Sequence, residues 1–138
     1  MFRHSFFLLG LMALVLAVGC AGGTGEAKAP LGQEFSLAIG QTAEITGQNL
    51  KIKFTEVIED SRCPRGVVCI WEGRVSAVVQ IDDGAAYRMV LTEPGLTDQG
   101  ARETYQKYEF AYHVEPYPEA GKKISPDEYR LLLTVKLR

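Results

Sequence analysis

The sequence VSAVVQIDDGAAYRMVL, residues 75–91, decides the fold class. Apolar residues occupy alternate positions before and after the turn triplet Asp82-Asp83-Gly84. A period of two is typical of a strand that buries one face, and an Asp-Gly pair between two such runs is typical of a β-hairpin. The stretch therefore predicts two antiparallel strands joined by a tight turn.

The same alternation recurs on both sides of this hairpin. The further runs cover residues 35–45, 50–58, 108–114 and 129–137. The adjacent apolar pair Val57-Ile58 shifts the phase of its run, which indicates a β-bulge. Six or seven strands with one apolar face each must bury those faces against one another, as an antiparallel β-sandwich or a small barrel does at about 100 residues. We predict an all-β domain over residues 35–138, with a short helix only within 97–107 and a loop crossing between sheets at 116–126.

The N-terminal end has the organisation of an export signal. The basic residue Arg3 precedes an apolar run over residues 6–18. As a helix this run rises only about 20 Å, less than the roughly 30 Å hydrocarbon core of a bilayer. It ends in small residues followed by Cys20, which resembles the lipobox of bacterial lipoprotein precursors, with Ala17 where Leu is more usual. We therefore interpret residues 1–19 as a cleaved signal peptide and not as a membrane span.

The lipobox resemblance implies that Cys20 becomes a lipid-modified N-terminus carrying acyl chains such as palmitate. Two or more chains hold a protein stably at a membrane. The implied location is extracytoplasmic, in the outer membrane of a host with two membranes, because Ala21 and not Asp follows the cysteine. Residues 20–34 are rich in Gly and Ala and predict a flexible linker. Ordinary signal cleavage that leaves a free cysteine is the alternative.

The charge of the chain after residue 19 argues against several partners. Removing Arg3 lowers the 15 basic residues to 14, against 17 acidic residues, so the net charge is near −3. A weakly acidic, well-mixed surface does not predict binding of nucleic acid or electrostatic docking to anionic lipid. Membrane attachment is therefore assigned to the lipid on Cys20, and nothing in the sequence indicates a cofactor.

Two cysteines remain once Cys20 is assigned to lipid. In an oxidising compartment, Cys63 and Cys69 most simply form a disulfide. Closing a loop of about seven residues removes denatured-state entropy worth roughly 2 kcal/mol. The alternative keeps both as thiols for a redox or metal role together with His113. Their Cys-x5-Cys spacing is looser than that of structural zinc sites, so we predict no metal site.

The segment DSRCPRGVVCIWEG, residues 60–73, is the most distinctive motif of the chain. It resembles a motif of small, uncharacterised bacterial lipoproteins, in which DSRCP is followed by Cys-x-Trp and a glycine between two strands of a β domain. Glu72 departs from that motif, because a small residue is typical at its position. The resemblance implies a β-domain lipoprotein but no particular activity.

Two interpretations of this segment stay open. In the first, the disulfide and an Asp60–Arg62 pair fix a long connection, while the Trp71 ring covers the disulfide and seals one end of the core. In the second, the rigid loop presents Arg62, Arg65 and Trp71 to a protein or glycan partner, since Arg and Trp are favoured interface anchors.

The sequence does not predict an enzyme. His113 is the single histidine after residue 19 and lies on the polar face of a predicted strand. No nucleophile elbow, zinc-protease motif or glycine-rich phosphate loop is present. We predict a non-catalytic binding or envelope-structural module. The alternatives are a protease-inhibitor-like domain that presents Arg65 on the braced loop to a trypsin-like pocket, and a metal-binding lipoprotein.

Overall fold

The computed structural model describes residues 25–95 and 100–138. Strands dominate this part of the chain, which also contains one short 3-10 helix, η1. The elements are β1 (Glu26–Ala29), β2 (Glu34–Ala38), β3 (Thr42–Ile45), β4 (Lys51–Asp60), β5 (Arg74–Asp82), β6 (Ala86–Pro94), β7 (Ala101–Tyr105), β8 (Tyr108–Glu115), η1 (Pro126–Glu128) and β9 (Arg130–Leu137).

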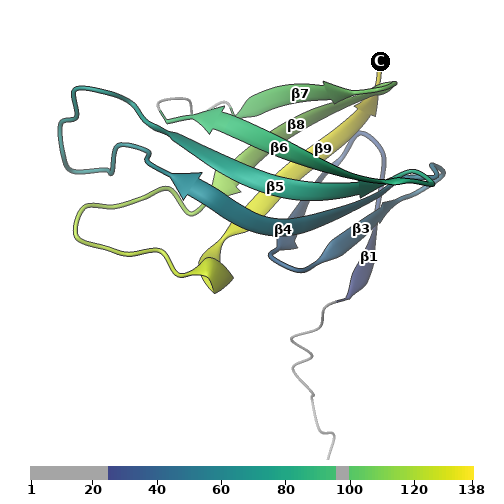
Figure 1. Ribbon diagram of the computed structural model, residues 1–138, viewed down its shortest axis with the longest axis horizontal. Coiled ribbons are helices and arrows are strands. Elements are labelled where there is room, and N and C mark those ends of the chain that lie inside the picture. The colour runs from purple at the N-terminus through teal and green to yellow at the C-terminus, as the bar shows by residue number, and fades with distance from the viewer. Residues whose placement is uncertain (1–24, 96–99) are drawn as a thin grey trace, which may run out of the picture.

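The strands form two sheets. One sheet has the order β1-β3-β4-β5-β6 and the other has the order β2-β9-β8-β7. In Figure 1 the β4-β5-β6 layer crosses in front of β8 and β9. The pairs are antiparallel except β1 with β3, which are parallel. The prediction of an antiparallel all-β domain is confirmed, and the two separate sheets make it a sandwich, with more strands than the six or seven expected.

The predicted hairpin is the β5–β6 pair. Ile81 pairs with Tyr87 and Asp82 with Ala86, so the turn lies where the Asp-Asp-Gly triplet predicts it. Alternate residues of β5 face the other sheet and are buried. They join a core to which both sheets contribute large side chains, among them Phe54, Ile81, Leu91, Phe110, Leu131 and Leu133.

The bulge in β4 is also confirmed. The register against β5 shifts between Phe54 and Glu56 and again between Val57 and Glu59. Val57 packs against the core, whereas the next residue, Ile58, is exposed. The extra residues therefore change which face of β4 points inward before the strand ends at Asp60.

Two expectations for the second half of the chain are wrong. Within residues 97–107, the described part is β7 followed by a turn at Gln106 (φ 51°), because pairing with β8 outweighs the weak helical preference of this stretch. Residues 116–125 do form the predicted loop, and Pro126 begins η1. However, that loop joins β8 to β9, which are neighbours in one sheet, and so it does not cross between sheets.

The predicted linker is also wrong over most of its length. Residues 26–29 form β1, and Ala29 is buried and accepts a hydrogen bond from the Thr46 N–H. The Gly32 N–H donates to the Val135 carbonyl, and β2 begins at Glu34. The backbone pairing that orders this stretch does not depend on apolar side chains, so its composition gave no signal. The predicted signal peptide, Cys20 and the first residues of the linker lie outside the described residues.

Candidate functional site

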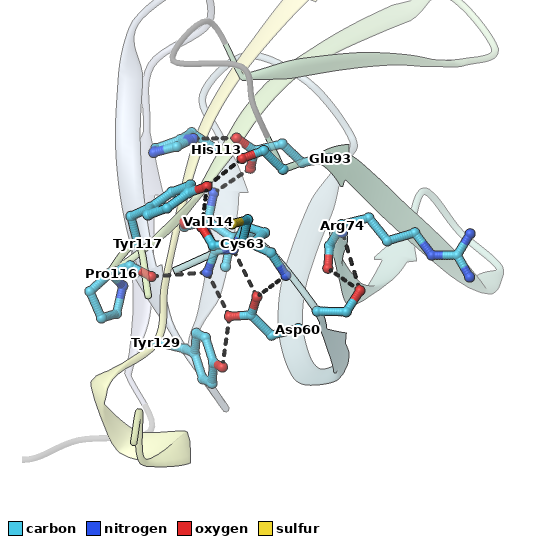
Figure 2. Close-up of polar contacts among 12 residues, drawn as sticks. Asp60, Cys63, Arg74, Glu93, His113, Val114, Pro116, Tyr117 and Tyr129 are labelled. Atoms are coloured by element: carbon cyan, nitrogen blue, oxygen red, sulfur yellow. Dashed lines mark hydrogen bonds and ion pairs between the residues drawn. The ribbon is translucent and has the colours of Figure 1, made fainter. Parts of the chain in front are cut away.

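The charged residues of the DSRCP motif lie at one end of the sandwich. Arg62 is 3% exposed and forms a two-pronged ion pair with Asp60, with Nε–Oδ1 at 2.8 Å and Nη2–Oδ2 at 2.7 Å. The Tyr129 hydroxyl donates to the same Asp60 Oδ2 at 3.0 Å (Figure 2). Burial, reinforced by the Asp60 charge and this hydrogen bond, raises the pKa of Tyr129 to about 12. The planar match of guanidinium to carboxylate holds Arg62 in one orientation.

Arg62 also completes the hydrogen bonding of β8 beyond the end of β7. The β7 pairing stops where Ala101 meets Tyr112. From there, Arg62 Nη1 donates to the Val114 carbonyl at 2.7 Å and Nη2 donates to the Pro116 carbonyl at 2.9 Å. Four of its five N–H donors are therefore bonded to a carboxylate and a strand edge of its own chain.

Glu93 satisfies the same edge from the other sheet. The Val114 N–H donates to Glu93 Oε2 at 2.9 Å, and Glu93 Oε1 lies 2.5 Å from His113 Nδ1 (Figure 2). Glu93 is 1% exposed. His113 was expected on the polar face of a strand, and its pairing with Glu93 was not predicted. The available signal was the alternation of β6, which places Glu93 on the same face as buried Leu91.

The β4–β5 connection, residues 61–73, projects from this end of the sandwich as the long arm in Figure 1. The predicted disulfide is confirmed, since Cys63 and Cys69 are bonded. At the base of the arm, the Ser61 N–H donates to the Arg74 carbonyl and the Cys63 N–H donates to the Glu72 carbonyl, at 2.8 and 3.0 Å. Gly73 has φ +69°, and a Cβ there would lie 1.8 Å from the Ser61 carbonyl oxygen.

Arg65 is exposed, but its backbone is already paired within the chain. Its N–H donates to the Pro118 carbonyl at 2.9 Å and its carbonyl accepts from the Ala120 N–H at 3.0 Å. Its guanidinium lies 5.2 Å from the centre of the Tyr117 ring. A substrate-like peptide binds a protease through main-chain hydrogen bonds. The geometry therefore does not favour Arg65 as the centre of an inhibitory loop.

Trp71 is not the plug that the first interpretation of the segment expected. Its side chain is 64% exposed, and Arg62, Tyr117 and Tyr129 close this end of the sandwich in its place. Val68 and Ile70 are fully exposed, at 102% and 109%. We call the exposed apolar residues of the arm the apolar tip; they are Val67, Val68, Ile70 and Trp71.

The three predicted binding residues are thus divided by the structure. Arg62 is inside, Arg65 lies on the flank of the arm against Tyr117, and Trp71 belongs to the apolar tip. Sequence analysis missed Val68 and Ile70. The signal for them was a run without charge between Arg65 and Glu72 in a loop that the disulfide keeps short.

Across residues 25–95 and 100–138, no group of three or more His, Cys, Asp or Glu side chains is placed to hold a metal ion. No helix in this described part is long and apolar enough to cross a membrane. Comparisons of the chain with protein-family models, with curated proteins and with solved structures find no significant match.

Proposed function

We propose that this protein is a lipid-anchored, extracytoplasmic β-domain that acts as a non-catalytic binding module, with the apolar tip as its contact site. The observation that carries the proposal is a difference within residues 60–73 between the base of the arm and its tip. The polar residues and the glycine at the base of the arm have partners inside the domain, whereas Val68, Ile70 and Trp71 project into solvent.

The exposure of the tip favours a binding role over a purely structural one. Burying apolar surface is worth about 25 cal/mol per Å², and a connection that served only to close the sandwich would turn its Trp and Ile inward. Here the closing contacts are made by Arg62 and Tyr117 instead. Large apolar side chains held away from the core are the surface that a partner would cover.

The construction of the arm also favours binding. The disulfide, the backbone bonds at its base and the Arg65 pairing with residues 118–120 hold it at three points. A loop that is already ordered loses little conformational entropy when it meets a partner. Trp is also among the residues most enriched at the energetic centres of interfaces.

The proposed location combines two arguments. The lipobox resemblance at Cys20 supports export and lipidation, and the Cys63–Cys69 disulfide supports an oxidising compartment. A lipid anchor would keep the domain near the envelope surface while leaving the tip free to make its contact.

Site-specific photo-crosslinking in a bacterial host tests this function. A photoreactive residue at position 68 of the full chain should form covalent adducts with protein, glycan or lipid. The same residue at position 90, an exposed valine on β6, is the matched control. Adducts at position 68 that are absent at position 90 support a contact site at the tip. Equal or no adduct formation at the two positions contradicts it.

A further inference from the structure

We infer that the partner of the apolar tip is a lipid bilayer, into whose interfacial region Val68, Ile70 and Trp71 insert. This inference rests on the proposed binding function and names its partner. The shape of the tip favours a bilayer. The side chains of Val68 and Ile70 are as exposed as in an extended peptide, at the end of an arm that projects from the domain (Figure 1). A fluid bilayer receives such a projection without a matching pocket, which a protein partner would have to supply.

The chemistry of the tip also favours a bilayer. Tryptophan is enriched at membrane interfaces, where its ring meets the acyl region and its N–H meets the headgroups. Aliphatic side chains beside it would reach the acyl boundary. No charged residue lies between Arg65 and Glu72, so no charged side chain at the tip itself opposes transfer out of water.

The charges around the arm indicate which lipid is suitable. Arg65 and Glu72 belong to the arm, Arg74 follows it, and Glu119 pairs by a backbone bridge with Arg65. Arg74 is itself paired with Glu59 at 2.8 Å. Because charges of both signs surround the tip, they produce no strong electrostatic field. Contact with a zwitterionic bilayer should therefore be driven by apolar burial and should depend little on salt.

The first strand of the domain begins close to Cys20 in the sequence. Glu26 pairs with Thr42, which pairs with Lys53, and it also forms an ion pair with Lys51, so the chain enters the five-stranded sheet beside the start of β4. The arm leaves from the other end of β4, after Asp60. Cys20 precedes Glu26 by six residues, which span at most about 20 Å of extended chain. A lipid on Cys20 would therefore keep the domain close to a bilayer.

The sequence contains a single tryptophan, Trp71, so its fluorescence reports on the tip alone. The full chain, processed by a bacterial host and purified, is reconstituted into phosphatidylcholine vesicles with or without bromine atoms near the glycerol end of the acyl chains. We expect Trp71 emission to shift to shorter wavelength and to be quenched by the brominated lipid, at low and at high salt.

The matched control moves the single tryptophan from the apolar tip to another exposed position. In Trp71→Phe/Val90→Trp the only tryptophan lies on β6, and we expect its emission to be the same in both kinds of vesicle. In Val68→Ser/Ile70→Ser, which retains Trp71, quenching should fall while the melting temperature stays unchanged, because neither side chain is in the core.

Unquenched Trp71, or quenching equal to that of the tryptophan at position 90, would overturn the bilayer inference. If position 68 then crosslinks selectively to a protein or glycan, the bilayer inference fails while the proposed binding function stands. Unquenched Trp71 together with no selective adduct at position 68 removes both.

Discussion

At Arg62, a residue type that often marks an interface serves instead as an internal connector. The guanidinium contacts the Asp60 carboxylate and the carbonyls of Val114 and Pro116, and it lies 5.1 Å from the centre of the Tyr117 ring. A single side chain thus links the end of β4, the end of β8 and the loop that follows β8. Its contribution is therefore to stability.

Replacing Arg62 by alanine should lower the free energy of unfolding by about 3–5 kcal/mol, because the substitution leaves a largely buried Asp60 carboxylate without its ion pair. Urea denaturation measures the loss. Arg74→Ala is the control, because its pair with Glu59 is exposed and should contribute no more than about 1 kcal/mol. Equal effects of the two substitutions would show that burial of the Arg62 pair is not what matters.

Tyr129 makes the stability of the domain sensitive to alkaline pH. Its pKa is raised to about 12 in the folded protein, from a usual value of 10.0. Between these values the unfolded chain binds fewer protons than the folded one, so the free energy of unfolding should fall as pH rises from 10 to 12. In Tyr129→Phe this fall should be shallower, whereas Tyr87→Phe, at an exposed ring, should retain it. Denaturation at several pH values gives the comparison.

The orientation of a single side chain was predictable where the sequence alternates regularly between inward and outward positions. The alternation of β6 places Glu93 inward, and the Asp60–Arg62 pair follows from two opposite charges two residues apart. The orientation of Trp71 did not follow, because a loop has no period from which to decide which side chain faces the core. At this end of the sandwich, Tyr117 and Tyr129, which come from distant parts of the chain, donate hydrogen bonds to Cys63 and Asp60.

At the scale of elements, the strands with strict alternation were predictable and the weak ones were not. The β5–β6 hairpin and the β4 bulge follow from local sequence. β1 and β7 are edge strands whose order depends on a neighbour, β3 in one case and β8 in the other. The arm between β4 and β5 is intermediate: its disulfide was predictable, but its projection was not.

Gly73→Ala should destabilise the base of the arm. The new Cβ would meet the Ser61 carbonyl oxygen, and the backbone is left-handed there. Gly47 is also left-handed, at φ +77°, but has open space around it, so Gly47→Ala should incur only the conformational cost of about 1–2 kcal/mol. A larger loss in Gly73→Ala than in Gly47→Ala, measured by urea denaturation, is the expected result; similar losses would contradict the close contact.

The double substitution Cys63→Ser/Cys69→Ser should lower stability by about 2–4 kcal/mol, as expected for removal of a disulfide. The melting temperature of the variant, compared with that of the oxidised protein, measures this. Reduction of the unmodified protein should produce a similar decrease. An unchanged melting temperature would mean that the backbone bonds at the base of the arm suffice to fix it.

At the scale of the whole molecule, an all-β domain with a shared core was predictable from the number of amphipathic strands, but the choice between a sandwich and a barrel and the strand order were not. The order depends on pairings between residues far apart in the chain, such as Glu34 with Thr134. The N-terminal boundary of the domain was also misplaced, because β1 is held by backbone pairing and a single buried alanine.

A chain that begins at residue 30 should therefore be less stable than one that begins at residue 25. The shorter chain loses the β1–β3 pairing and the burial of Ala29. Each kcal/mol lost should lower the melting temperature by about 4–8 °C in a domain of this size. Calorimetry on the two chains tests whether β1 is part of the cooperative domain. Identical melting temperatures would show that residues 26–29 do not contribute to the stability of the domain and are better described as linker.

The side chains that line β8 beyond β7 have a further consequence for the protein at high concentration. An open strand edge is a template on which another copy can add a strand, the first step toward aggregation. Arg62 and Glu93 already occupy the Val114 N–H and the carbonyls of Val114 and Pro116, so a neighbouring chain finds no free hydrogen-bonding groups there. These two residues should thus hinder strand addition at this edge, and we expect the loss of either to favour aggregation as well as to weaken the fold.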